Sequence, residues 1–377
     1  MKKKIVIVFI FLGAFAGFSF VNKPAPQFRG RSFKIALLLP FCSDVPEAEF
    51  KRKKLAPIQK AALEYYEGIL TALDSLEKLG FECNLTVYDT QKDSLTTLRI
   101  LQKPEIKNMD FIIGPLFKEG INMLAEYCLQ NKIYHLSPVV SVVSSVSTPY
   151  LINTNTDISN FDKSIADFWV RDFDTANIYI IHDGKKSMKA LAEKLRSKPD
   201  SINMLKVKIL NAVPYLKTED IISTPERPAL LLVLSNDENW VNRQMKNVKD
   251  LENFTLMGLE SWLDFKSPDF EKWIAYHCLF ATAHHVNIAN AKGFRTLYRT
   301  KYYIEPSEYS YKGFDQMLYI GKLYNSYVAN WTNHLDESYQ ALHNNFSLDQ
   351  DPVNKQWINT EIKILKLEEN GLMQMYR

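Results

Sequence analysis

The chain has 377 residues, of which 46 are basic and 43 acidic, and 46% of its residues are hydrophobic. A chain of this length and hydrophobic content can build two cores of ordinary domain size. The formal charge of only +3 argues against a nucleic-acid partner, which calls for a concentrated basic face.

The first 16 residues have the features of a cleaved export signal. Three lysines precede an apolar run that ends in Ala14-Phe15-Ala16, the small-x-small pattern that signal peptidase accepts. The run is short for a membrane span, which needs about 20 apolar residues, so an uncleaved anchor is the alternative. No cysteine follows the run, which argues against a lipoprotein. We therefore expect an exported, periplasmic protein with a signal peptide over 1–16 and a flexible lead-in over 17–32.

After the lead-in, apolar strands alternate with helices whose apolar residues recur every three or four positions. This alternation predicts a parallel sheet with helices on both faces. The predicted strands are 33–40, 85–89, 111–113 and 133–136, and the predicted helices are 61–79, 95–101 and 121–129.

The pattern starts again after Pro149, which predicts a second doubly wound sheet. Its predicted strands are 177–182, 207–210, 229–234, 254–258 and 275–283, with helices at 158–173, 187–196 and 240–251. Further helices are expected at 290–303 and 317–331, the latter after the segment Tyr311–Asp315, and a last strand at 361–367. The fold class is therefore α/β, with two doubly wound parallel-sheet lobes.

Two successive strands of the first sheet end in turns that carry small or polar residues. Gly114-Pro115 ends one strand, and Ser137-Pro138 ends the next. Parallel strands end at the same edge of their sheet, and in open α/β sheets this carboxyl edge is where ligands bind. The sequence therefore predicts a binding site at this edge.

No set of residues indicates catalysis, metal binding or a cofactor. The four cysteines are far apart in the sequence, which argues against a metal knuckle or a redox pair, and we expect them to be unpaired. His284 and His285 are adjacent and would point in opposite directions in an extended segment. His135 lies in an apolar strand, where we expect a core histidine with its hydrogen bonds satisfied. We therefore expect a protein that is not an enzyme and needs no cofactor.

Several segments, in this order, resemble the type I periplasmic binding protein superfamily, especially its branched-chain amino-acid binding group. They are KIALLLP, YYEGILTALDSL, VYDT, IIGPL, HLSPVVS, IIHDG and GFDQMLYIG. The first helix and DFIIGPL most resemble exported proteins of Bacteroidetes-type bacteria that often carry LysM peptidoglycan-binding modules, although this chain has no LysM-like segment. The superfamily also includes a domain of an outer-membrane activator of penicillin-binding proteins.

The resemblance implies two lobes between which the chain crosses three times. Lobe one is expected over 33–148 plus 286–340, and lobe two over 149–285 plus 341–377. It also implies that the ligand lies in a cleft between the lobes.

The resemblance further implies which residues hold the ligand. In amino-acid binders of the family, groups at the two strand ends of lobe one hold the ligand carboxylate, and an acid of lobe two holds the ammonium. Two positions differ from the family, since Lys118 replaces a serine and Ser187 replaces an aromatic residue, and Lys118 favours a ligand with a further anionic group. For Lys118, Ser141 and Glu260 the alternative is an ordinary surface role. The implied ligand-binding residues are Leu116, Phe117, Lys118, Ser137, Val139, Ser141, Ser187 and Glu260.

Two functions fit these features. The first is a solute-binding or sensory protein for a small polar ligand such as an amino acid or peptide, working with a membrane permease. The second is an interaction or regulatory domain that contacts a protein of cell-wall synthesis and transports nothing.

Overall fold

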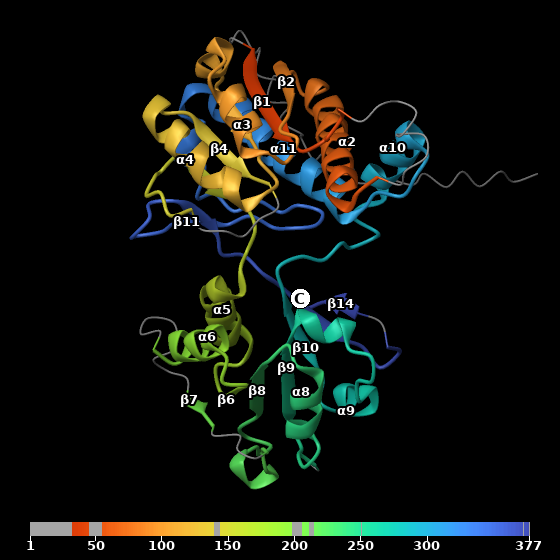
Figure 1. The fold of residues 1–377 in the computed structure, drawn as a ribbon. Helices are drawn as coiled ribbons and strands as arrows, with labels where there is room; N and C mark the ends of the chain where they lie inside the picture. Colours follow the sequence, from red (N-terminus) through yellow and green to blue (C-terminus); the bar gives the residue numbers. More distant parts are fainter. Residues whose placement is uncertain are drawn as a thin grey trace, which may run out of the picture.

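The computed structural model describes residues 32–44, 55–138, 144–197, 206–210, 215–249, 251–371 and 373–376. The predicted export signal and all but the last residue of the predicted lead-in lie outside this part of the chain. Two lobes, each with a seven-stranded sheet flanked by helices, stand one above the other and are joined by extended segments (Figure 1). The predicted α/β class with two doubly wound lobes is confirmed.

The sheet of lobe one has the strand order β11-β12-β5-β4-β3-β1-β2. All neighbouring strands are parallel except β11 and β12 at one edge, which are antiparallel. Its central strands are short runs of buried apolar residues, as expected for a sheet covered on both faces. The strands are β1 (Phe33–Leu39), β2 (Cys83–Asp89), β3 (Phe111–Ile113), β4 (Tyr134–Ser137), β5 (Leu151–Asn153), β11 (Leu348–Gln350) and β12 (Trp357–Asn359).

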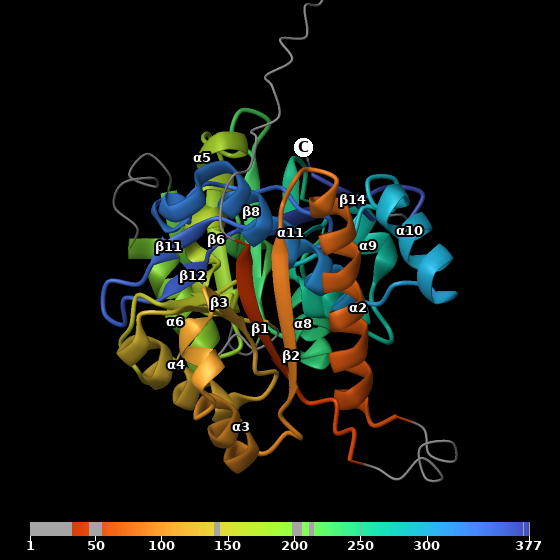
Figure 2. The same ribbon diagram turned by 90° about the horizontal axis from the view of Figure 1, so that it is seen from above.

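Helices cover both faces of this sheet (Figure 2). One face packs on α2 (Pro57–Glu77), α10 (Lys292–Tyr302) and α11 (Glu308–Tyr327) through a large aromatic cluster. The opposite face packs on α3 (Ser94–Leu101) and α4 (Lys118–Asn131). The short helices η1 (Pro104–Asn108) and η5 (Val328–His334) complete the lobe.

The helices α2 and α11 approach each other closely at two glycines. A Cβ atom at Gly313 would lie 2.1 Å from the carbonyl oxygen of Tyr65, and one at Gly68 would lie 2.1 Å from that of Ser310. Only glycine allows the two backbones to come this near. The contact fixes α11 in place, and with it the polar residues of its first turns.

Lobe two repeats the plan with the strand order β14-β13-β10-β9-β8-β6-β7. The neighbouring strands β10, β9, β8, β6 and β7 are parallel. At the β10 edge the sheet continues with β13 and β14, where β13 pairs antiparallel with both β10 and β14. The strands are β6 (Asn177–His182), β7 (Lys206–Ile209), β8 (Ala229–Leu234), β9 (Phe254–Leu259), β10 (Leu279–Thr282), β13 (Lys363–Leu367) and β14 (Met373–Met375). The helices are η2 (Ile158–Asn160), α5 (Asp162–Asp172), α6 (Lys186–Ser197), η3 (Thr218–Asp220), α8 (Glu238–Met245), η4 (Glu260–Asp264) and α9 (Phe270–Ala275).

The predicted lobe boundaries need correction at two places. Strand β5, which the boundary at 148/149 assigned to lobe two, pairs with β4 of lobe one. Strands β11 and β12, which the boundary at 340/341 also assigned to lobe two, pair with each other and with β5. The chain therefore crosses between the lobes at 154–157, 283–291 and 360–362.

Two predicted elements also differ from the structure. Helix α11 starts at Glu308, so Tyr311–Asp315 lies inside the helix instead of preceding it. The strand predicted from residue 275 starts at Leu279, because α9 occupies the segment up to Ala275. Within the described ranges, no helix combines the length and apolar character that crossing a membrane requires.

Candidate ligand-binding site

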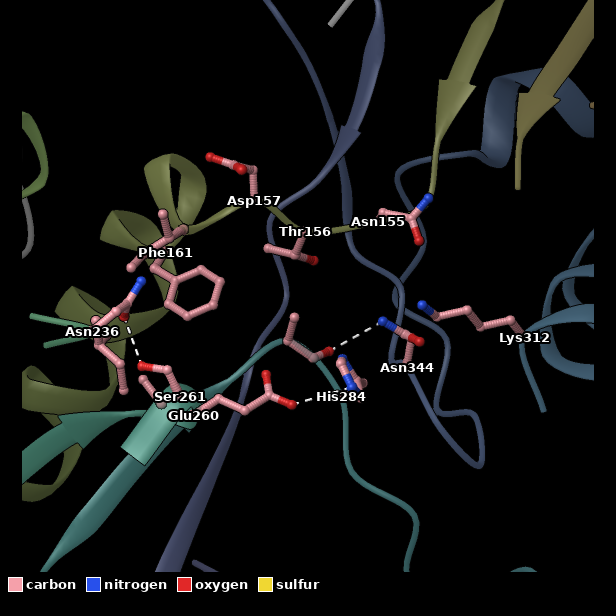
Figure 3. A pocket seen from close by; sticks show the side chains of 14 residues that line it. Asn155, Thr156, Asp157, Phe161, Asn236, Glu260, Ser261, His284, Lys312 and Asn344 are labelled. Carbon is pink, nitrogen blue, oxygen red and sulfur yellow. Dashed lines mark hydrogen bonds and ion pairs between the residues drawn. The ribbon is translucent and has the colours of Figure 1, made fainter. Parts of the chain in front are cut away.

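A pocket of about 350 Å³ lies where the crossing segments meet the sheet of lobe two (Figure 3). It opens at the carboxyl ends of β8, β9 and β10, the edge at which open α/β sheets bind ligands. The segment that follows β5 closes a second side, and α11 of lobe one contributes one side chain. Its polar lining residues are Asn155, Thr156, Asp157, Asn236, Glu260, Ser261, His284, Lys312 and Asn344.

The short helix η4, which follows β9 directly, places Glu260 and Ser261 in the pocket wall. Strand β9 contains Gly258, against which the indole of Trp262 lies so closely that a Cβ at Gly258 would be 2.6 Å from the ring. Trp262 is fully buried and donates its indole N–H to the Ser235 carbonyl oxygen at 2.9 Å. Because Trp262 is anchored in the core, the preceding residues of the turn face the pocket.

Glu260 is partly exposed and pairs with a crossing segment. Its Oε1 lies 3.1 Å from Nε2 of His284, just after β10. Ser261 donates to Oδ1 of Asn236 at 2.7 Å. The carboxylate of Glu260 is therefore available at the pocket surface while one of its oxygens contacts the imidazole.

Lys312 provides a cation from lobe one. It is 8% exposed and its Nζ lies 2.5 Å from Oε1 of Glu308, one helical turn earlier on α11. Burial raises the pKa of the Glu308 carboxyl, but the charge of Lys312 and its hydrogen bond outweigh this and lower the pKa below its usual value. A pocket with a carboxylate on lobe two and an ammonium on lobe one can hold both charges of a small zwitterion.

Side-chain amides fix the crossing segments around the pocket. Asn344 donates to the Ala283 carbonyl oxygen at 3.1 Å, and Asn155 donates to that of Ser137 at 3.4 Å. Thr156 donates to the Glu361 carbonyl oxygen at 3.0 Å, which links the first and third crossing segments. These bonds hold the pocket walls in a defined arrangement.

Two buried ionisable groups, Asp315 and Lys363, bond to the loop that carries His343. Asp315 of α11 accepts the backbone N–H of Leu342 and His343 at 3.1 and 2.7 Å, and burial raises its pKa to about 7. Lys363 donates to the carbonyl oxygens of His285 and His343 at 2.8 and 2.7 Å, and burial lowers its pKa to about 8. Lys363 thereby connects the second crossing segment to the loop that carries His343.

The structure places one of the eight residues implied by the resemblance, Glu260, in this pocket. Leu116 and Phe117 are buried in lobe one, and Ser137 is buried at the end of β4. Ser187 is exposed on α6. Lys118 is the first residue of α4, but its side chain lies outside the described part, as do Val139 and Ser141.

Most of the polar residues that line the pocket were not predicted from the sequence. Asn155, Asn236 and His284 each follow the carboxyl end of a strand by two residues. Ligands bind at the carboxyl ends of parallel strands, so the reasoning applied to the turn at Ser137 also predicts these three residues. Lys312 had no such signal, because it lies within a helix.

No family model matches the sequence, and no curated protein matches it either. Solved structures do match the fold. A protein of Rhodospirillum rubrum described as a branched-chain amino acid ABC transporter is 12% identical with a TM-score of 0.61, over 92% of this chain and 100% of that one.

LpoA from Haemophilus influenzae matches to a similar degree. The full-length protein is 13% identical with a TM-score of 0.55, over 92% of this chain and 59% of that one. Its C-domain, described as a regulator of PBP1A, is 13% identical with a TM-score of 0.54, over 91% of this chain and 100% of that one. Identities this low establish a shared architecture and nothing finer. The two seven-stranded lobes, the three crossings and these likenesses together show that the chain has the type I periplasmic binding protein fold, as the sequence indicated.

Proposed function

We propose that the protein is an exported binding protein that holds a small polar ligand in the pocket between its lobes. The observation that carries this proposal is the lining itself, in which Glu260 of lobe two and Lys312 of lobe one face one cavity of about 350 Å³ together with asparagine amides. This volume lies within the range of small-molecule sites. An amino acid or short peptide offers the matching ammonium and carboxylate groups.

Binding would be coupled to the relative position of the lobes. The lobes are joined by three crossing segments, and hinge closure around a ligand is a common motion in such proteins. A ligand that touches Glu260 and Lys312 at once interacts with both lobes, so it favours the arrangement in which both contacts are made. Such a protein could deliver its ligand to a membrane permease or report its presence to a sensor.

The likeness to LpoA supports a second candidate, a regulatory domain that binds a protein of cell-wall synthesis. LpoA and the transporter protein match this chain with comparable TM-scores. In this second function the pocket would bind no ligand, and the protein partner would bind the outer surface.

A thermal-shift screen decides between the two. A ligand bound by the native state alone adds about 2.7 kcal/mol at a hundredfold excess over Kd. We expect several degrees of stabilisation of the wild type by at least one compound among amino acids, peptides and peptidoglycan fragments. If no compound shifts the midpoint while pull-down from the cell envelope recovers a cell-wall synthesis protein, the regulatory function replaces the binding function.

A further inference from the structure

A cluster of metal-ligating side chains lies at the edge of the pocket. Among the described residues, His284, Glu308 and His343 each offer one ligand atom, and the three atoms lie within 4.8 Å of one another. His284 belongs to the second crossing segment, Glu308 starts α11, and His343 lies in the loop before β11. Two imidazoles and a carboxylate are a donor set that suits Zn²⁺ and its neighbours in the first transition row.

Each histidine has one ring nitrogen held by an oxygen acceptor. Nε2 of His284 lies 3.1 Å from the Glu260 carboxylate. Nδ1 of His343 contacts Oδ1 of Asn344, whose Nδ2 is in turn bonded to the Ala283 carbonyl oxygen, so the amide presents its oxygen to the ring. A neutral imidazole that donates through one nitrogen keeps a lone pair on the other. Metal-bound histidines are typically oriented by such outer contacts to carboxylates and carbonyls.

His343 lies on the buried side of the cluster. Its side chain is 2% exposed, and its Nδ1 is held by the Asn344 side chain. The ring is therefore already positioned before a metal ion binds.

We propose that His284, Glu308 and His343 bind a divalent transition metal ion such as Zn²⁺ at the junction of the two lobes. A tetrahedral zinc site with bonds of about 2.0–2.2 Å needs its ligand atoms closer together than they are here. The His284 and His343 rings are also stacked, with centroids 4.4 Å apart. The side chains must therefore rotate when the metal ion binds. The ion ties the second crossing segment to lobe one. The metal site does not rest on the proposed small-ligand function, but the two sites share His284, and Lys312 lines the pocket beside both.

Lys312 opposes metal binding and provides a sharp test. Its ammonium occupies the cationic position next to Glu308 in the metal-free protein. A metal ion must displace this ammonium and then lie near its charge. Removing the charge while keeping most of the aliphatic stem, in Lys312→Met, should therefore raise the affinity for Zn²⁺.

The experiment is calorimetric titration of the chelator-treated, tag-free protein with Zn²⁺. We expect one saturable site per chain, at least about tenfold weaker binding in Glu308→Gln and His284→Ala, and tighter binding in Lys312→Met. His277→Asn changes an exposed histidine outside the cluster and should bind Zn²⁺ as the wild type does. Circular dichroism confirms that each variant is folded.

Titration with Co²⁺ gives an independent readout, since visible absorption bands report ligand geometry. Wild-type bands that disappear in Glu308→Gln support the site. Equal Zn²⁺ affinity in the wild type, Glu308→Gln and His284→Ala would overturn the proposal, and so would the lack of a saturable site in both the wild type and Lys312→Met. Either result leaves the small-ligand screen unaffected.

Discussion

Replacing Gly313 with alanine is expected to destabilise lobe one by about 3 kcal/mol, the upper part of the usual range for overpacking a close contact. The new methyl group would meet the Tyr65 carbonyl oxygen at 2.1 Å, and backbone cannot move aside as a flexible side chain can. Gly68→Ala should have a similar effect, because its methyl group would meet the Ser310 carbonyl oxygen from the opposite helix. Denaturant unfolding of each variant measures the change.

Gly293 in α10 is the matched control. It is also a helical glycine, but a Cβ there meets nothing within 4 Å. Alanine has the better helix propensity by up to about 1 kcal/mol, so Gly293→Ala should leave the free energy of unfolding unchanged or raise it. If Gly313→Ala and Gly293→Ala change stability alike, the close approach of α2 and α11 is not as the structure has it. The position of Lys312 on α11 would then also be in question.

His135 is expected to contribute to the loss of stability in acid, and the variant His135→Leu should remove the contribution of this side chain. The side chain is fully buried in β4, and neither ring nitrogen has a hydrogen-bond partner among the described residues. Burial lowers its pKa from 6.5 to about 3. The folded protein therefore keeps the ring neutral, while the unfolded chain protonates it below pH 6.5.

The sign of the pH dependence follows from this difference. A histidine with a depressed pKa contributes its full stability above the unfolded value of 6.5, and this stability is lost as pH falls towards the folded value of about 3. The loss is about 1.4 kcal/mol for each pH unit in that window. Leucine has a similar volume and no polar atoms, so the stability gain of His135→Leu over the wild type should grow as pH falls from 7 to 4.

Unfolding titrations at pH 8, 6 and 4.5 test this prediction. The difference at pH 8 serves as the internal baseline, since the ring is neutral there in both states. A stability difference between wild type and His135→Leu that stays constant from pH 8 to 4.5 would contradict the buried, neutral histidine.

The order of helices and strands could be predicted from the sequence, because apolar runs indicate the strands and the helical spacing of apolar residues indicates the helices. Strands β1, β8 and β9 and helices α2 and α4 lie where the pattern indicated. The lobe boundaries could not be predicted as well. Strands β11 and β12 are only three residues long, too short to form a recognisable apolar run. Only their pairing assigns them to lobe one.

The candidate site was harder to predict for a related reason. The resemblance implies Glu260, whereas Lys312 is one polar residue in α11, and only the tertiary packing shows that it faces the pocket. The sequence shows His284 only beside its neighbour His285, whereas its ring stacks on that of His343, which is far away in the sequence. His135 is predicted to have satisfied hydrogen bonds, but neither of its ring nitrogens has a partner within the described ranges. Such pairings depend on the folded arrangement, which local patterns do not contain.

Calorimetric titration of pocket variants with a compound found by the screen tests whether Glu260 and Lys312 hold a ligand. We expect Glu260→Gln and Lys312→Met each to weaken binding by at least about tenfold, since each leaves a ligand charge desolvated without its partner. Ser187→Ala, at an exposed position of α6 outside the pocket lining, should bind the compound as tightly as the wild type. Unchanged affinity in Glu260→Gln and Lys312→Met, with a loss in Ser187→Ala, would show that the ligand binds outside this pocket.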